Sequence, residues 1–143
     1  ADLVEALRQQ RAAVIALVAE INGQIAGYVL YSPVTIETNR LNRNILGLAP
    51  LAVHPAFQHR GIGSSLILSS FEVCRDQAID GAVVLGSSDY YPRFGFSPAG
   101  NYGMGCEYPV TPQEFMVISF HPGGFEGCSG IVHYHPLFAG LDV

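Results

Sequence analysis

The chain has 143 residues, of which 49% are hydrophobic and 13% are charged, and its formal net charge at pH 7 is −5. This length and composition indicate one folded domain over residues 1–143 and exclude an intrinsically disordered chain. All seven basic residues are scattered arginines, so no basic stripe marks nucleic acid as a partner.

The sequence also lacks the marks of a membrane, secreted or metal-binding protein. No window is apolar over the length that a membrane span needs, and the N-terminus carries no basic segment followed by an apolar run. We therefore expect a cytoplasmic protein without membrane partners. Cys74, Cys106 and Cys128 show no Cys-x-x-Cys spacing, so we expect reduced thiols. His121, His133 and His135 lie on or beside late strands, but no further close ligand pair accompanies them, so we expect no metal.

The first part of the chain predicts a helix followed by three strands. Residues 2–11 have the apolar spacing of an amphipathic helix. Residues 13–20 and 24–32 read as strands, and the Asn-Gly pair between them is favoured in tight hairpin turns. A polar link at residues 37–40 then leads to a buried strand that ends at Val53.

The second part predicts one long helix, further strands and a short helix. Cys74 falls on the apolar side of the long helix, so we expect it to be a buried core residue. The last two strands are expected to close the sheet and are separated by a glycine-rich loop. The expected ranges are 61–77 for the long helix, 82–86 for a strand, 90–94 for the short helix, Phe96 for a strand, and 114–121 and 130–134 for the last strands.

The junction between the buried strand and the long helix predicts a phosphate or diphosphate site. Unpaired amides at a helix N-terminus point at an anion, and the helix dipole adds a partial positive charge. Gly61 and Gly63 let the backbone approach the anion closely, and Arg60 offers a forked, permanently charged donor. A Gly-x-Gly turn also occurs in proteins that bind nothing, so the motif alone leaves both interpretations open.

Two common phosphate-binding motifs do not match this junction. A Walker-type loop ends in Gly-Lys-Ser or Gly-Lys-Thr, and the chain contains no lysine. The dinucleotide fingerprint requires a third glycine where this chain has Leu66. Nucleotide hydrolysis and nicotinamide binding are therefore both disfavoured.

A second motif gives the junction a context. Tyr90-Tyr91-Pro92-Arg93-Phe94-Gly95-Phe96 follows the strand predicted at residues 82–86. The order of strand, Gln-x-x-Gly-x-Gly, long helix, strand and Tyr-x-x-x-Gly-Phe resembles the GCN5-related N-acetyltransferase (GNAT) superfamily. Taken together with Leu51-Ala52-Val53-His54-Pro55, the amino-acid sequence of this motif is most similar to the bacterial, YhbS-like branch of the superfamily. The close match covers about residues 46–98.

The resemblance implies the acyl-CoA N-acyltransferase fold. This is an α+β architecture, an α/β/α sandwich whose mixed central sheet contains two parallel strands that splay apart; here they would be the strand ending at Val53 and the strand at 82–86. The family fold opens with a strand and a helix before its first hairpin, whereas the element order here starts at the second helix. We therefore expect the first strand and helix to be missing, which would expose a sheet edge and part of the substrate groove.

The resemblance also implies acetyl-CoA as the cosubstrate of an N-acetyltransferase, in which an amine attacks the thioester directly. In the family the coenzyme lies between the splayed strands, where strand backbone pairs with the pantetheine arm and the turn holds the pyrophosphate. The residues so implied are Leu51, Ala52 and Val53 on the strand, and Gln58, His59, Arg60, Gly61, Ile62, Gly63 and Ser64 in the turn and helix start.

Tyr91 matches the tyrosine of the second motif, whose family role is the acid that protonates the leaving thiolate. A phenol pKa near 10 lies close to that of a thiol, which suits this role. The alternative is a packing tyrosine with its hydroxyl in water. We interpret Tyr90 as core or pocket wall, and Arg93 as a solvated helix residue that could instead reach a cofactor phosphate.

The sequence does not identify a general base. Many relatives carry a glutamate on the strand before the turn, but that strand is apolar here. Glu37, Glu107, Glu114 and His54 are candidates, and a water relay or an amine that arrives neutral would need none of them.

Three functions remain compatible with these residues. The first is acetylation of a small-molecule primary amine, the second is acetylation of a protein or peptide amine, and the third is noncatalytic CoA binding or sensing. The high apolar content with few charges also predicts a self-association surface, for which a homodimer is the simplest form.

Overall fold

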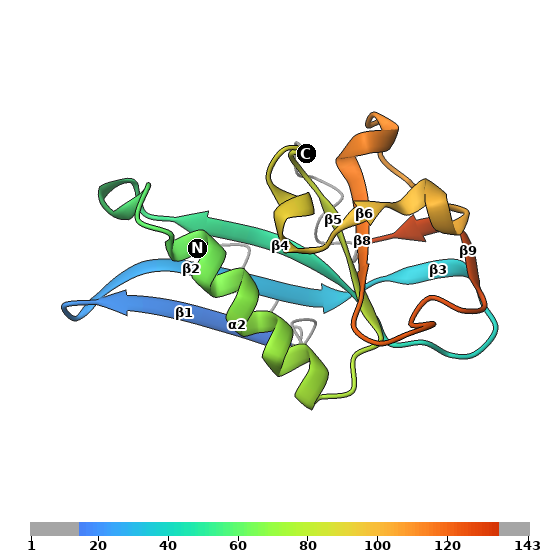
Figure 1. The fold of residues 1–143 in the computed structure, drawn as a ribbon, viewed down its shortest axis with the longest axis horizontal. Helices are drawn as coiled ribbons and strands as arrows, with labels where there is room; N and C mark the ends of the chain where they lie inside the picture. Colours follow the sequence, from blue (N-terminus) through green and yellow to red (C-terminus); the bar gives the residue numbers. More distant parts are fainter. Residues whose placement is uncertain (1–14, 135–143) are drawn as a thin grey trace.

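The computed structural model describes residues 15–134, which form two sheets and one long helix (Figure 1). The helix predicted at residues 2–11 lies outside the described residues, as does the start of the first predicted strand. The described strands are β1 (Ile15–Ile21), β2 (Gln24–Pro33), β3 (Thr35–Asn39), β4 (Ile45–Val53), β5 (Gly81–Leu85), β6 (Ser97–Pro98), β7 (Met104–Cys106), β8 (Phe115–Ser119) and β9 (Cys128–His133). The helix is α2 (Ile62–Asp76), and short 3₁₀ helices are η1 (Pro55–Phe57), η2 (Tyr91–Phe94), η3 (Ala99–Tyr102) and η4 (Pro112–Glu114).

The large sheet has the strand order β1-β2-β4-β5-β8-β6. The predicted hairpin is confirmed, because β1 and β2 pair antiparallel across a turn in which Asn22 and Gly23 have φ angles of 52° and 79°. Two consecutive left-handed residues are what a tight hairpin turn of this kind requires. The expectation that residues 114–121 join this sheet is also confirmed, since β8 pairs antiparallel with β5.

Helix α2 crosses one face of the large sheet, over β1, β2 and β4 (Figure 1). Its buried positions recur with helical spacing, so one stripe faces the core: Leu66, Ile67, Ser70, Phe71 and Cys74. The predicted burial of Cys74 is confirmed.

The core under α2 contains one buried polar pair. Tyr31 and Ser70 are fully buried, with 2.6 Å between the phenol oxygen and Oγ. Ser70 donates its only hydroxyl hydrogen to the carbonyl of Ile67, so Tyr31 is the donor in the pair. Burial raises the pKa of Tyr31 well above its usual value, and the phenol stays neutral.

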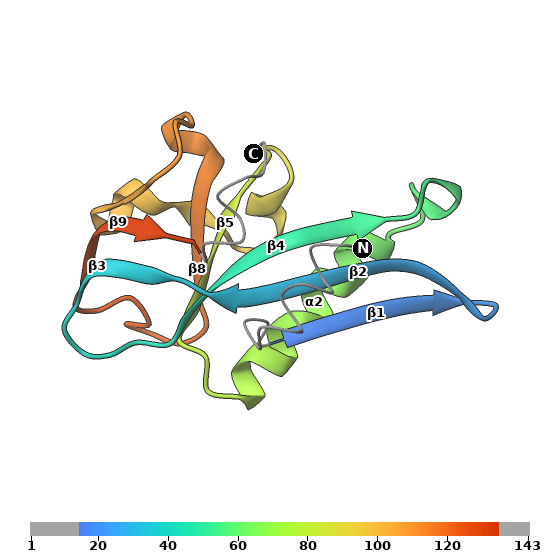
Figure 2. The ribbon, with the colours of Figure 1, turned by 180° about the vertical axis from the view of Figure 1, so that it is seen from behind.

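The last strand does not close the large sheet, contrary to the expectation for residues 130–134. β9 instead lies in a three-stranded sheet, antiparallel to β3 and parallel to β7 (Figure 2). The prediction that residues 37–40 form a polar link outside the sheets is also wrong, because most of these residues belong to β3. Its backbone pairs with β9 while most of its polar side chains stay at least partly accessible, so a polar composition did not prevent strand pairing.

The small sheet packs on the face of the large sheet opposite α2. Val132 of β9 shares a buried cluster with Leu30, Ile45, Val83 and Val117 from four strands of the large sheet. The expected α+β fold is confirmed, with α2 forming the helical layer on one face within the described residues and the small sheet covering part of the other.

The parallel strands β4 and β5 separate after a short paired segment. They pair at only three positions, the last of which is Gly47 with Val83. Beyond this point β4 continues to Val53 along β2, whereas β5 continues to Leu85 along β8 (Figures 1 and 2). The splayed parallel pair predicted from the resemblance is therefore present.

Candidate functional site

A pocket of about 660 Å³ lies where the end of β4 meets the start of α2. Eight of the ten residues expected to bind the cofactor line it, and Ala52 and Arg60 do not. Phe57, Tyr90 and Arg93 complete the lining. The expected residues found there are Leu51, Val53, Gln58, His59, Gly61, Ile62, Gly63 and Ser64.

The N-terminus of α2 opens into this pocket without a cap of its own. Gly61 occupies the N-cap position with φ +77°, no side chain of residues 15–134 caps the helix, and no acidic residue lies in its first turn. The first intrahelical bond runs from Ser65 N to Gly61 O over 3.0 Å, so the amides before it are free of helical partners. A 15-residue helix adds its dipole to these amides, which makes this end attractive to an anion.

The turn that precedes α2 is tied to the end of β4. The Nε2 of Gln58 donates to the carbonyl of Val53 over 3.3 Å. His59 has φ +65°, a left-handed conformation that carries the chain round to Gly61. Gln58 thus holds the turn in place, and His59 contributes its backbone conformation.

Tyr90 forms the wall opposite the turn. A Cβ atom added to Gly63 would lie 3.1 Å from the Tyr90 hydroxyl, so the close approach of these two segments depends on glycine. The ring also packs edge-on against Tyr91 and Phe94, with centroids 5.2 Å apart in each pair. The interpretation of Tyr90 as pocket wall agrees with this position.

Tyr91 begins η2, next to Tyr90, and is not among the residues that line the pocket. Its ring packs directly on Gly86 and edge-on against Phe96, with a centroid distance of 5.6 Å. Burial raises the pKa of Tyr91, and the neighbouring Tyr90 raises it further. The phenol is therefore protonated at neutral pH, as a proton donor must be.

None of the four candidate bases lines this pocket. His54 accepts a backbone N–H at the start of η1, and Glu114 closes the capping box of η4. Glu107 accepts from a histidine ring and a backbone amide at the end of β9, and Glu37 accepts a backbone N–H of the same strand. Burial acts to raise the pKa of Glu107, but these hydrogen bonds outweigh it and lower the pKa. Each candidate thus has a structural partner elsewhere.

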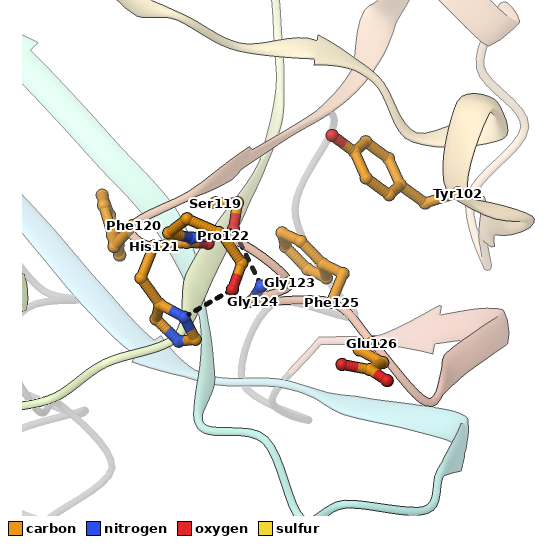
Figure 3. Close-up of a pocket in the computed structure, with 9 residues that line it drawn as sticks. All are labelled: Tyr102, Ser119, Phe120, His121, Pro122, Gly123, Gly124, Phe125 and Glu126. Atoms are coloured by element: carbon orange, nitrogen blue, oxygen red, sulfur yellow. Dashed lines mark hydrogen bonds between the residues drawn. The ribbon is translucent and has the colours of Figure 1, made fainter.

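A second pocket, also of about 660 Å³, lies at the opposite end of β5 (Figure 3). His121 Nε2 is 2.7 Å from a carboxylate oxygen of Asp80, and Ser119 lies two residues before this histidine. These residue types suggest a nucleophilic triad, but the Ser119 hydroxyl donates to the His121 carbonyl and not to its ring. Nδ1 of His121 faces the carbonyl of Pro122 at 3.0 Å. The arrangement closes a loop and does not activate a nucleophile.

Two further structural findings concern residues 15–134. No group of three or more histidine, cysteine, aspartate or glutamate side chains there is placed to hold a metal ion. No helix in that part of the chain is long and apolar enough to cross a membrane.

Residues 12–98 match the family model described as the acetyltransferase (GNAT) domain, which covers more than half of the chain. This chain belongs to the GNAT family. The resemblance inferred from the two motifs is confirmed, and the matched residues contain β4, the turn, α2 and the tyrosine segment.

Bacterial relatives of this GNAT protein agree over most of its length. It is 32% identical to the uncharacterized N-acetyltransferase YhbS of Escherichia coli K12 over 139 residues, covering 96% of this chain and 82% of YhbS. The crystal structure of E. coli YhbS in complex with CoA has a TM-score of 0.90 and 30% identity, covering 99% of this chain and 78% of that chain. A GNAT acetyltransferase from Brucella melitensis in complex with acetyl-CoA has a TM-score of 0.76 and 34% identity, covering 96% and 76%.

Proposed function

We propose that this GNAT protein transfers the acetyl group of acetyl-CoA to a primary amine by direct attack of the amine on the thioester. The observation that carries the proposal is the single pocket that joins the splayed end of β4 to the uncapped N-terminus of α2. The similar E. coli and Brucella proteins, solved with CoA and acetyl-CoA, support the choice of ligand.

The residues of the pocket fit the parts of acetyl-CoA. The amides at the start of α2, at Ile62, Gly63 and Ser64, would bind the pyrophosphate. Leu51 and Val53 would line the pantetheine arm along this side of β4, because no strand within residues 15–134 pairs with β4 there once β5 has diverged. The thioester would then lie between the two strands, toward Tyr91.

Tyr91 would act when the C–S bond breaks. The amine nitrogen forms a bond to the carbonyl carbon, the sulfur leaves as a thiolate, and the Tyr91 O–H proton passes to the sulfur. The amine loses its surplus proton to water, because no carboxylate or imidazole of the four candidate bases lines the pocket. Solvent then returns a proton to the phenolate. This assignment requires a neutral phenol, which a tyrosine is at neutral pH, and the raised pKa of Tyr91 keeps it so.

Binding and turnover of Tyr91→Phe test the proposal together. We expect saturable acetyl-CoA binding by calorimetry, acetyl transfer to members of a panel of small amines and peptides, and no binding of NADH. Tyr91→Phe should retain acetyl-CoA affinity while turnover falls by about 10²–10⁴-fold, the usual contribution of a general acid. Tyr102→Phe is the matched control, since Tyr102 is exposed and lies outside this pocket.

The outcomes separate the alternatives. Full turnover by Tyr91→Phe would remove this residue from the mechanism. Tight acetyl-CoA binding without transfer to any amine or peptide would favour the noncatalytic CoA-binding module, and a preference for peptides over small amines would identify a protein acetyltransferase.

A further inference from the structure

The pocket is flanked by two arginines, and the structure separates their roles. Arg60 belongs to the glycine turn, yet it does not line the pocket, and its guanidinium lies over the ring of Phe57 at 5.5 Å. Arg93 belongs to η2, on the other side of the pocket, and it does line it. The arginine nearest to the phosphate motif in sequence is therefore not the one that faces the site.

Tyr90 supports Arg93 beside the anion-binding end of α2. The Arg93 guanidinium lies over the Tyr90 ring at 5.5 Å from its centroid, a cation–π contact. The hydroxyl of the same ring approaches Gly63 in the first turn of α2. One aromatic side chain thus spans from the helix amides to the guanidinium, so the cation and the amides share one pocket.

Arg93 is also free to bind a ligand. Its Nε donates to the backbone carbonyl of Asp89 at 3.4 Å, which orients the guanidinium and leaves its terminal N–H groups available. Within residues 15–134, no carboxylate forms an ion pair with it, whereas Arg43 is paired with both Asp80 and Glu126. An arginine with no ion-pair partner among residues 15–134, in a pocket that favours anions, has the geometry for a phosphate.

We propose that Arg93, and not Arg60, is the side chain that binds the coenzyme pyrophosphate, from the side opposite to the α2 amides. This inference rests on the proposed acetyl-CoA site and adds to it a side-chain ligand. The amides of α2 would bind one face of the diphosphate, and the Arg93 fork would bind the other while stacked on Tyr90. Arg60 would act only by packing its guanidinium on Phe57.

Calorimetric titration of the full chain with CoA tests the proposal. We expect Arg93→Gln to raise the CoA dissociation constant about ten- to a hundredfold at low salt, the effect of losing a charge-assisted hydrogen bond, and the effect should shrink as salt screens the charge. Arg60→Gln should change the constant much less. Arg75→Gln removes the same charge near the far end of α2, where this arginine stacks on Phe120, and is the control for net charge.

A second ligand distinguishes the two phosphate groups of the coenzyme. Dephospho-CoA keeps the pyrophosphate and lacks the 3′-phosphate, so Arg93→Gln should weaken its binding by the same factor as for CoA. An effect seen with CoA and lost with dephospho-CoA would overturn the assignment to the pyrophosphate. If the wild-type protein binds CoA and Arg93→Gln binds it with the same dissociation constant, the role of Arg93 is wrong and the proposed function stands. If the wild-type protein does not bind CoA at all, the proposed function is wrong as well.

Discussion

The contact between Tyr91 and Gly86 makes it possible to move the proposed acid without removing it. A Cβ atom added to Gly86 would overlap Cε2 of Tyr91 and lie 2.9 Å from Cδ2. Packed carbon atoms are ordinarily about 3.5–4.0 Å apart, so the ring must shift by about 1 Å in Gly86→Ala. Phe96 also restricts the ring, because it packs edge-on against Tyr91.

We expect Gly86→Ala to lower the rate of acetyl transfer by about 10²-fold, since a misplacement of about 1 Å can cost that much. The acetyl-CoA dissociation constant should change far less than the rate, because the residues proposed to bind the pyrophosphate and the pantetheine arm are elsewhere, at the end of β4 and the start of α2. Overpacking by the added methyl group should cost Gly86→Ala about 1–3 kcal/mol of unfolding free energy. Thermal melting followed by circular dichroism checks that the variant is still folded. Release of free CoA thiol measures the rate, and calorimetry measures the affinity.

Gly100→Ala in η3 is the matched control, because a Cβ added there meets no atom within 4 Å. In a Tyr91→Phe background, adding Gly86→Ala should lower the rate little further, since the two changes act on the same group. Wild-type turnover in Gly86→Ala would refute the reasoning. A second hundredfold loss in the Tyr91→Phe background would also refute it, because Gly86 would then act by another route.

Two further predictions concern stability. Ser70→Ala should cost about 1–3 kcal/mol of unfolding free energy in urea titrations, because the buried Tyr31 hydroxyl loses its acceptor, and Tyr31→Phe should cost less, about 0.5–1.5 kcal/mol; the reverse order would contradict the donor assignment. The hydrogen bond to Asp80, with that to the Pro122 carbonyl, raises the pKa of His121 in the folded protein. The histidine therefore stabilises the fold at pH values below its pKa in the unfolded chain, and this contribution is lost as pH rises through its pKa in the folded protein. Burial acts to raise the pKa of Asp80, but hydrogen bonds from His121 and a backbone amide, with the charge of a nearby arginine, lower it. The stability that this carboxylate contributes to the fold is therefore lost as pH falls through its pKa in the folded protein. The melting temperature of His121→Gln should fall furthest below wild type between about pH 4 and 6.5 and converge with it at higher pH, and a gap that widens toward alkaline pH would contradict this sign.

The parts of the site that are local in the chain were predictable from the sequence. The start of α2 just after Gly61 follows from a strand, a glycine turn and an apolar helical stripe that are consecutive in sequence. The hairpin at Asn22 and the burial of Cys74 follow in the same way, from turn chemistry and helical spacing. The order of the motifs then predicted the family and the splayed strands, although neither strand shows by itself where the two diverge.

The directions of side chains in the site were not predictable in this way. Arg60 and Arg93 are both exposed arginines, and only their packing against Phe57 and Tyr90 decides which of them faces the pocket. The sequence around the candidate bases did not indicate which groups they would hydrogen-bond. Glu107, for example, is held by groups of the chain that follow it by more than twenty residues.

The sequence by itself determined most of the local elements, the glycine turn at the start of α2 and the membership of an acetyltransferase family, because these depend on neighbouring residues and on the order of motifs. The tertiary structure alone decided that β9 pairs with β3 in a second sheet, that Arg93 and not Arg60 enters the pocket, and that Tyr91 rests on Gly86. The pairing of β9 with β3 joins segments about ninety residues apart, and the directions of the Arg93 and Tyr91 side chains depend on packing with neighbours that the local sequence does not specify. These contacts are selected by which strand edges and apolar faces remain free once the local elements have formed.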